Sequence, residues 1–326
     1  MTDLGTLGGD IAFPSQITAA NIVGGSITAA DLENAFFTSN TSGLMDLPGL
    51  GGGNAVAFGV NAGDNAAGIS YLLDHTTEHA VAWEQGKPID LGTLPGGDYS
   101  EAFGINAANL VVGNSTTTVK GYSYRAFVWQ SVDGIGAMAG IGLLPGGGYS
   151  LFNAINSNGL AVGSADTVIG AGKAAVAGEH AILWDVVHGL QDLGTLGGRS
   201  SVARGINVAT QVVGASDTAL GEQHAFLWDS AHGMQDLGVL PDYDSTSANS
   251  INDSGQVAGN AYDTGTHRFS GFVWDRVNGM RDVNTLVPPG LGLHLSNVVN
   301  NNQGWLVAAG NDGSGHQSVV LLVPEP

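Results

Sequence analysis

One stretch, residues 192–228, contains the whole repeating unit of this chain and reads DLGTLGGRSSVARGINVATQVVGASDTALGEQHAFLW. Four short elements follow one another in it: a turn that begins Asp-Leu-Gly, an Ile-Asn pair, an apolar run that ends in Gly214, and His-Ala-Phe-Leu-Trp from His224 to Trp228. The same order recurs along the whole chain. A tandem repeat of this kind has to be recognised before any other feature is interpreted.

The unit occurs seven times. In each copy a leucine closes the first turn, and successive leucines stand 43 to 52 residues apart. These leucines are Leu7, Leu50, Leu94, Leu144, Leu196, Leu240 and Leu286. The Ile-Asn element recurs as Val60-Asn61, Ile105-Asn106, Ile155-Asn156, Ile206-Asn207, Ile251-Asn252 and Val299-Asn300, with Ile17-Thr18 as a degenerate first copy. A period of about 40 to 50 residues is too long for leucine-rich or ankyrin repeats and is typical of propeller blades.

Each element predicts a β-strand. In Ala102–Asn106 the large residues Phe103 and Ile105 alternate with smaller ones, which is the period of a strand. In His224–Trp228 both strand faces are apolar, so both faces need cover. Turn sequences such as Asn-Asp-Ser-Gly at residues 252–255 separate the elements and favour tight hairpins. The unit is therefore predicted to be a four-stranded antiparallel meander.

A chain built from such sheets, with no helical periodicity, predicts an all-β fold, a seven-bladed β-propeller of four-stranded antiparallel blades. We expect one domain over residues 1–326, with blades at about 10–49, 54–93, 99–143, 149–195, 200–239, 245–285 and 294–322. The last blade lacks a fourth strand of its own, so the N-terminal strand, Met1 to Gly5, is expected to close it. A parallel β-helix is the alternative, but its coils of about 20 residues carry no hairpins.

Composition excludes several classes of protein. The chain has 326 residues, 52 of them Gly and none Cys, and 29 acidic against 9 basic side chains give a net charge of −20. Without cysteine there is no disulfide and no thiolate metal site. Without a basic surface, nucleic-acid binding is not expected. No apolar run is long enough for a membrane span, and the strong net charge favours a monomer.

Residues that recur in most copies are interpreted as architectural. We expect the histidines of the His-Ala-Phe element to bond an aspartate or a turn of a neighbouring blade; they are His79, His180, His224 and His316. The repeated aspartates are expected to cap backbone N–H groups in their turns; they are Asp90, Asp192, Asp236 and Asp282. The tryptophans that close the fourth element are expected in the core. Functional residues should instead be those that depart from the repeat.

The loops after each Leu-Gly-Gly or Leu-Pro-Gly connect one blade to the inner strand of the next, so they are expected to converge at one mouth of the channel. Their variable positions supply the candidate site. The candidate metal ligands are Asp10, Asp98, Asp242 and Asp244. The candidate ligand-binding residues are Tyr99, Tyr149, Arg199 and Tyr243, and His294 is the candidate catalytic base. Clustered carboxylates suit Ca²⁺, which takes six to eight oxygen ligands; no organic cofactor is expected.

The motifs Asp192-Leu-Gly-Thr-Leu-Gly-Gly, Gly205-Ile-Asn and His224-Ala-Phe-Leu-Trp resemble the HAF-repeat family of bacterial extracellular proteins, over essentially the whole chain. The final Val323-Pro-Glu-Pro resembles the start of a PEP-CTERM sorting signal trimmed at that point. Together the two resemblances imply export from a Gram-negative cell, with retention at the cell surface or in the extracellular matrix. They imply no particular reaction and no catalytic residues.

Three functional hypotheses follow. The leading one is a secreted propeller that binds a small molecule, a glycan or a matrix component on an acidic channel face. The alternative is a calcium-dependent lactonase or ester hydrolase at the same mouth, in which the metal would polarise a carbonyl and activate water. The third is a structural surface protein. The sequence has no Gly-x-Ser-x-Gly, His-Glu-x-x-His or phosphate-binding glycine motif.

Overall fold

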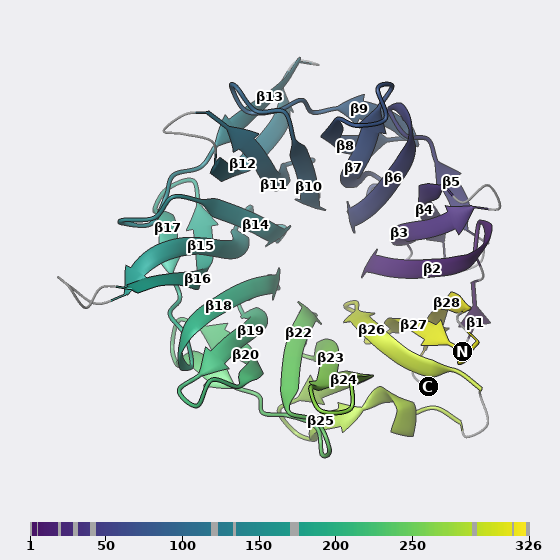
Figure 1. The fold of residues 1–326 in the computed structure, drawn as a ribbon, viewed down its shortest axis with the longest axis vertical. Coiled ribbons are helices and arrows are strands. Elements are labelled where there is room, and N and C mark those ends of the chain that lie inside the picture. Colours follow the sequence, from purple (N-terminus) through teal and green to yellow (C-terminus); the bar gives the residue numbers. More distant parts are fainter. Residues whose placement is uncertain are drawn as a thin grey trace.

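The computed structural model of the protein describes residues 2–4, 6–18, 21–28, 32–39, 44–118, 123–132, 135–169, 176–288, 292–314 and 316–323. These residues form an all-β structure whose one helical element is the short 3₁₀ segment η2 (Val283–Thr285). No described helix is long and apolar enough to cross a membrane. The strands form sheets that are arranged around a common centre, and in each set of four strands one strand lies innermost (Figure 1).

Three sheets have four strands each. The strands are antiparallel and follow one another across the sheet in the order of the chain. The first contains β6 (Gly51–Val60), β7 (Ala66–Leu72), β8 (Glu78–Glu84) and β9 (Lys87–Asp90). The second contains β10 (Ser100–Ile105), β11 (Val111–Thr117), β12 (Ser123–Val132) and β13 (Ile135–Gly140). The third contains β22 (Ser245–Ile251), β23 (Val257–Asp263), β24 (Arg268–Asp275) and β25 (Gly279–Asp282). These are the four-stranded meanders that the repeat predicts.

Two further sheets have eight strands each. One contains β14 (Ser150–Ile155), β15 (Ala161–Ile169), β16 (Val176–Asp185), β17 (Gly189–Asp192), β18 (Gly197–Ile206), β19 (Val212–Thr218), β20 (Gln223–Asp229) and β21 (Gly233–Asp236). The other contains β26 (His294–Asn300), β27 (Leu306–Asn311), β28 (Gln317–Leu322), β1 (Thr2–Asp3), β2 (Gly8–Ile17), β3 (Asn21–Thr28), β4 (Glu33–Ser39) and β5 (Met45–Leu47).

A single parallel residue pair joins the two halves of each eight-stranded sheet. Glu179 of β16 pairs with Ser200 of β18, and Ile11 of β2 pairs with Gln317 of β28. All other pairings within these sheets are antiparallel. Each eight-stranded sheet is therefore two four-stranded antiparallel groups that touch at one point.

The two ends of the chain pair with each other. Strand β1 lies antiparallel to β28, and the backbone N–H of Leu4 donates to the carbonyl of Val319 at 2.9 Å. The predicted pairing of the N-terminal strand with the last strand of the chain is confirmed over Thr2–Asp3; Met1 and Gly5 lie outside the described residues. The last sheet thus takes its fourth strand from the other end of the sequence.

The glycine that ends the apolar run is required by close packing inside the sheet at Gly113 and Gly214. The innermost strand shifts register against its neighbour, as between Ala102 and Gly104 in β10. At Gly113 an added Cβ would stand 2.0 Å from the carbonyl oxygen of Glu101, and at Gly214 it would stand 1.9 Å from that of Val202. Only glycine fits there, because both contacts are with backbone atoms.

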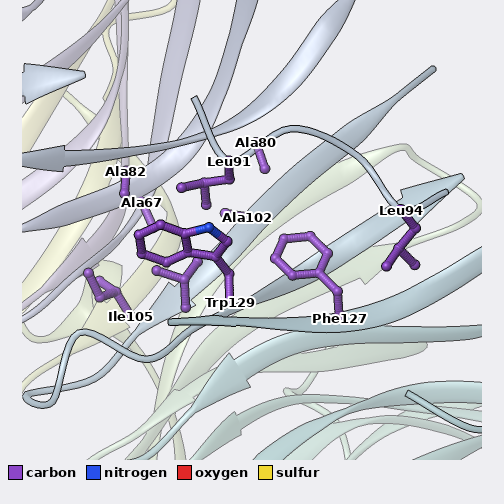
Figure 2. Packing of buried hydrophobic residues seen from close by; sticks show 10 residues of the cluster. Ala67, Ala80, Ala82, Leu91, Leu94, Ala102, Ile105, Phe127 and Trp129 are labelled. Atoms are coloured by element: carbon purple, nitrogen blue, oxygen red, sulfur yellow. The ribbon is translucent and has the colours of Figure 1, made fainter. Parts of the chain in front are cut away.

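The hydrophobic core lies between neighbouring sheets, as Figure 2 shows for one interface. Phe127 and Trp129 of β12 pack with Ala67 and Ala82 of the preceding sheet, and Leu91 and Leu94 from the connecting segment complete the cluster. Trp129 is 4% exposed and Trp83 is 1% exposed. The prediction that these tryptophans belong to the core is confirmed for both. Large residues on one sheet and alanines on the next let the sheets interdigitate.

Candidate functional site

A cavity of about 480 Å³ lies where the innermost strands meet. Its walls are the final residues of β2, β6, β10, β14, β18, β22 and β26, together with the hairpins that follow these strands. These seven strands surround the centre in Figure 1. The cavity is within the size range of small-molecule sites in proteins.

A ring of asparagine side chains surrounds the mouth of this cavity. Each donates from Nδ2 to the backbone carbonyl of the next ring residue: Asn61 to Asn106 (2.9 Å), Asn106 to Asn156 (3.4 Å), Asn156 to Asn207 (3.0 Å), Asn207 to Asn252 (3.0 Å), Asn252 to Asn301 (3.0 Å), and Asn301 to Thr18 (2.8 Å). The ring side chains are almost fully buried, for example Asn207 at 3% exposed. The mouth is therefore fixed by side-chain bonds that run from group to group.

The ring corrects one detail of the sequence alignment. We aligned Val299-Asn300 with the other Ile-Asn pairs, but Asn301 makes the ring bonds. Asn301 also accepts from Gly304 N, just as Asn252 accepts from Gly255 N. The last residue pair of β26 and β27 is Asn300 with Leu306, whereas that of β22 and β23 is Ile251 with Val257, so Asn300 takes the place of Ile251 and Asn301 that of Asn252.

The residue three positions before the ring residue varies most in chemistry. In six of the seven strands it lines the cavity: Ser15, Phe58, Phe103, Asn153, Arg204 and Asn249. Phe58 and Phe103 stack on each other, with ring centroids 5.0 Å apart and 23° between their planes. The cavity wall is thus aromatic on β6 and β10 and polar from β14 to β22.

Arg204 provides the one positive charge among the residues that line this cavity. Its side chain is exposed to the cavity, and it makes no hydrogen bond or ion pair with any residue that the structure describes. Surrounding protein lowers the pKa of its guanidinium, an effect that the charge of Glu179 partly opposes. The guanidinium nevertheless stays protonated at neutral pH, as arginine does in proteins.

The other five arginines all have partners within the described part of the chain. Arg125 and Arg199 donate to the carbonyls of Gly148 and Ala177. The remaining three pair with aspartates: Arg268 with Asp263 (3.4 Å), Arg276 with Asp229 (3.6 Å) and Arg281 with Asp275 (2.8 Å). Arg204 is therefore distinct from every other arginine in this chain.

The cavity contains one carboxylate, that of Asp253, and its oxygens are already used. Oδ1 accepts from the N–H of Val208 at 3.1 Å, and Oδ2 accepts from the side-chain amide of Asn302 at 2.6 Å. The acidic face was predicted at the opposite mouth, from the aspartates of the connecting loops, and none of those aspartates lines this cavity. What the cavity offers a ligand is a positive charge, amide groups and an aromatic stack.

The predicted ligand-binding residues lie at the opposite ends of the inner strands and do not line the cavity. Tyr99 donates from its hydroxyl to Glu101 at 2.9 Å, and burial raises the pKa of Tyr99. Burial and the charge of Glu179 raise the pKa of Tyr149 to about 12. Tyr243 lies under the guanidinium of Arg268, 5.4 Å from its ring centroid. Arg199 is exposed beside Ala177.

The predicted metal ligands Asp10, Asp98, Asp242 and Asp244 also lie outside the cavity, and all four are exposed. Asp244 accepts from the backbone N–H of Thr264 at 3.0 Å, and Asp98 from the hydroxyl of Thr116 at 3.1 Å. Within the described ranges no three His, Asp or Glu side chains come close enough to hold a metal ion. The structure therefore does not bring these four aspartates together in one carboxylate cluster.

His294, the candidate base, is exposed at the start of β26, and its Nε2 lies 2.5 Å from the carbonyl oxygen of Phe269. That ring nitrogen must carry the proton, because a carbonyl only accepts. A proton could then be taken up only at the other ring nitrogen, Nδ1. His294 does not line the cavity either.

Three of the four recurring histidines make the predicted bond to an aspartate. His79, His180 and His224 bond Asp90, Asp192 and Asp236 at 2.8 to 2.9 Å. The partner lies on the adjacent strand of the same group rather than on a neighbouring one, which corrects the expected geometry. The same aspartates accept from the glycine N–H two residues on, at 2.7 to 2.8 Å, so the predicted turn capping is confirmed.

Comparison with known proteins defines the fold. The β-propeller domain of the Trilobed protease from Pyrococcus furiosus, reported with an open velcro topology, matches with a TM-score of 0.57 at 9% identity, over 98% of this chain and 95% of that one. This chain is a β-propeller. The Pyrococcus horikoshii acylaminoacyl peptidase matches this propeller with a TM-score of 0.53 at 11% identity, over 96% of this chain and 51% of that one. A gluconolactonase from Xanthomonas campestris, at TM-score 0.42 and 13% identity over 83% and 90% of the two chains, is too distant to bear on activity.

No family model matches the sequence. No curated protein matches it either. A proposal about the function of this propeller therefore has to be argued from its own residues.

Sequence reasoning missed Phe58, Phe103 and Arg204, although the repeat carried a signal for them. The copies read Ala-Phe-Gly-Val-Asn, Ala-Phe-Gly-Ile-Asn and Ala-Arg-Gly-Ile-Asn at residues 57–61, 102–106 and 203–207. A charged side chain replaces an aromatic one in an otherwise constant frame. The search for departures from the repeat was confined to the loops, whereas this departure lies within a strand.

Proposed function

We propose that the protein is a seven-bladed propeller of the HAF-repeat type, exported to the cell surface or the extracellular matrix. The blade count rests on treating each eight-stranded sheet as two blades joined by one residue pair. It is supported by the seven inner strands around the cavity and by the ring from Thr18 to Asn301. Export rests on the repeat motifs and on the Val323–Pro326 motif, of which residues 324–326 lie outside the described residues.

The propeller acts as a binding module, and its ligand site is the central cavity at the asparagine-ring mouth. The observation that carries this proposal is Arg204, an arginine without a partner among the described residues, standing in a cavity of about 480 Å³. The Arg204 guanidinium is exposed to the cavity without a hydrogen bond or ion pair to a described residue, and a ligand with an acidic group can supply that partner.

The hydrolase alternative has no comparable support. Its four aspartates do not form a ligand set, and its proposed base uses Nε2 to donate to a carbonyl. The geometry therefore favours binding at the ring mouth over metal-assisted hydrolysis at the opposite mouth.

The test is to fill the cavity and measure binding. Ser15 lines the cavity and its side chain makes no hydrogen bond with a described residue, so Ser15→Trp occupies space without removing a known contact. Wild type is screened by thermal shift against sugars, sugar acids, amino acids and short oligosaccharides at about 10 mM, where even weak binders with millimolar Kd register. Each hit is then measured with Ser15→Trp and with Arg199→Trp, which places the same indole at the opposite end of an inner strand.

Hits that disappear with Ser15→Trp and persist with Arg199→Trp support the proposal. Hits that survive Ser15→Trp would place the site elsewhere and overturn it. An absence of hits with the wild-type protein would favour the structural role. Far-ultraviolet circular dichroism of both variants establishes that loss of binding does not reflect loss of the fold.

A further inference from the structure

The polar part of the cavity wall has a definite order, which determines what kind of ligand it can hold. Arg204 of β18 stands between Asn153 of β14 and Asn249 of β22, all at the same position of the repeat. Both asparagines line the cavity with it. A ligand group placed against the guanidinium therefore lies next to two amide side chains.

These two amides are oriented by their own hydrogen bonds. Asn153 donates from Nδ2 to the carbonyl of Ala203 at 2.8 Å, and Asn249 donates from Nδ2 to the carbonyl of Val298 at 3.3 Å. Neither Oδ1 accepts a hydrogen bond from a described residue. One N–H of each amide is thus committed to the neighbouring strand, and Oδ1 together with the second N–H is left for a ligand. Next to the positive charge, the wall calls for hydroxyl donors.

A further acceptor lies in the same wall. Asn300 of β26 is 7% exposed, and its Oδ1 is buried without a partner among the described residues, although its Nδ2 donates to the carbonyl of Gln256 at 2.7 Å. A buried acceptor without a partner is costly, and such groups are commonly completed by a ligand or an ordered water. Asn300 lines the cavity, but its Oδ1 has almost no accessible surface, so the acceptors that a ligand can reach are those of Asn153 and Asn249.

The remaining wall is aromatic. Phe58 and Phe103 stack on one another, and both line the cavity. Aromatic rings in a binding site pack against the flat, apolar C–H surface of a ring-shaped ligand, and burial of that surface from water is favourable. The cavity thus presents one anion receptor, several hydroxyl acceptors and one apolar surface.

We propose that the ligand is a carboxylated sugar, a uronic acid alone or at the end of a short acidic oligosaccharide. Its carboxylate pairs with Arg204, its hydroxyl groups donate to Asn153 and Asn249, and a face of its pyranose ring lies toward Phe58 and Phe103. A neutral sugar would leave the guanidinium without a partner, and an aromatic acid would leave the amide oxygens without donors. This inference rests on the central cavity being the binding site.

The experiment measures the affinity of named probes by isothermal titration calorimetry. The probes are D-glucuronate, D-galacturonate and tri-galacturonate, with D-glucose, D-galactose and benzoate as comparisons. A salt concentration of about 150 mM shortens the screening length to about 8 Å, so the net negative charge of the protein contributes little. The variants are Arg204→Gln, which removes the charge in the cavity, and Arg199→Gln, which removes one charge from the same strand at the opposite mouth.

We expect the sugar acids to bind about 10-fold or more tightly than the neutral sugars and benzoate, because a charge-assisted hydrogen bond is stronger than a neutral one. Arg204→Gln is expected to lower affinity for the sugar acids by about 10- to 100-fold and to leave the neutral sugars unchanged. Arg199→Gln should change neither by more than about two-fold. Tighter binding of the trimer than of the monomers would identify the end of an acidic polymer as the source.

Equal affinity for acidic and neutral sugars, or sugar-acid binding that Arg204→Gln does not weaken, would overturn this inference. If Ser15→Trp still abolishes that binding, the cavity remains the site and only the ligand class is wrong. Benzoate as tight as the sugar acids would overturn the assignment of sugar hydroxyls to Asn153 and Asn249. No binding of any probe or screened compound would overturn both proposals.

Discussion

Replacing Asn207 by alanine tests whether the asparagine ring stabilises the propeller. Asn207 is 3% exposed and makes three hydrogen bonds with its side chain. Nδ2 donates to the carbonyl of Asn252 at 3.0 Å and to Oε1 of Gln211 at 2.7 Å, and Oδ1 accepts from the backbone N–H of Gln211 at 2.9 Å. The substitution removes all three.

The expected loss of stability depends on whether the former partners of the Asn207 side chain keep another hydrogen bond. The carbonyl of Asn252 keeps a second donor, the N–H of Gly255 at 3.0 Å, so it is not left without a partner. The N–H of Gln211 loses its acceptor inside the hairpin. An unsatisfied backbone donor costs about 1 to 3 kcal/mol, and each ordinary bond contributes about 1 kcal/mol. We therefore expect Asn207→Ala to lower the free energy of unfolding by about 2 to 4 kcal/mol.

The assay is urea unfolding followed by the fluorescence of the six tryptophans. The matched control is Asn158→Ala, in the preceding hairpin, where an exposed side chain makes one 3.1 Å bond to the carbonyl of Val208. We expect that control to lose about 0.5 kcal/mol or less. If the two variants are equally stable, the ring bonds do not stabilise the fold and the reasoning is refuted.

Three further substitutions probe packing, closure and charge. In Gly214→Ala the new Cβ would stand 1.9 Å from the carbonyl oxygen of Val202, so this variant should unfold at a markedly lower urea concentration than wild type. The control is Gly142→Ala, whose Cβ meets nothing within 4 Å and which should unfold as wild type does. Equal unfolding midpoints for the two variants would contradict the close approach at Gly214. Deleting residues 1–4 removes the strand paired with β28 and should cost about 3 kcal/mol; an unchanged melting temperature would argue against closure by the N-terminal strand. Burial raises the pKa of Glu101, so ionisation of this side chain lowers the stability of the fold above its folded pKa and has no effect below its unfolded pKa. Glu101→Gln should therefore be more stable than wild type at about pH 7 but not at about pH 3.5. An equal gain at both pH values would refute this reasoning.

The repeat made most of the fold predictable. Strand positions, hairpins, the buried tryptophans and the His–Asp pairs all follow from features that recur, because each copy must meet the same packing demands on both faces. Asn301 shows where this reasoning ends. The ring position is Asn301 and not Asn300, and the sequence of residues 299–302, Val-Asn-Asn-Asn, offers no basis for choosing between them.

The location of the cavity was not predictable in the same way. Alternation along a strand tells which residues share a face, but it does not tell which end of the inner strand borders open space. We placed the site at the connecting loops, where sequence variation is most obvious. The open space instead lies at the hairpin ends, where Arg204 and the two stacked phenylalanines vary within a constant frame.

This difference between the scaffold and the cavity has a structural cause. The asparagine ring and the inter-sheet core use the same residue types in almost every copy, because each blade has the same neighbours. The residue three positions before the ring lines the cavity and contacts the neighbouring sheet only in part, so packing constrains its identity less. Phenylalanine, asparagine and arginine can then occupy equivalent places around one centre. A repeated scaffold thereby acquires an asymmetric site, with the charge of Arg204 on one side and the Phe58–Phe103 stack on another.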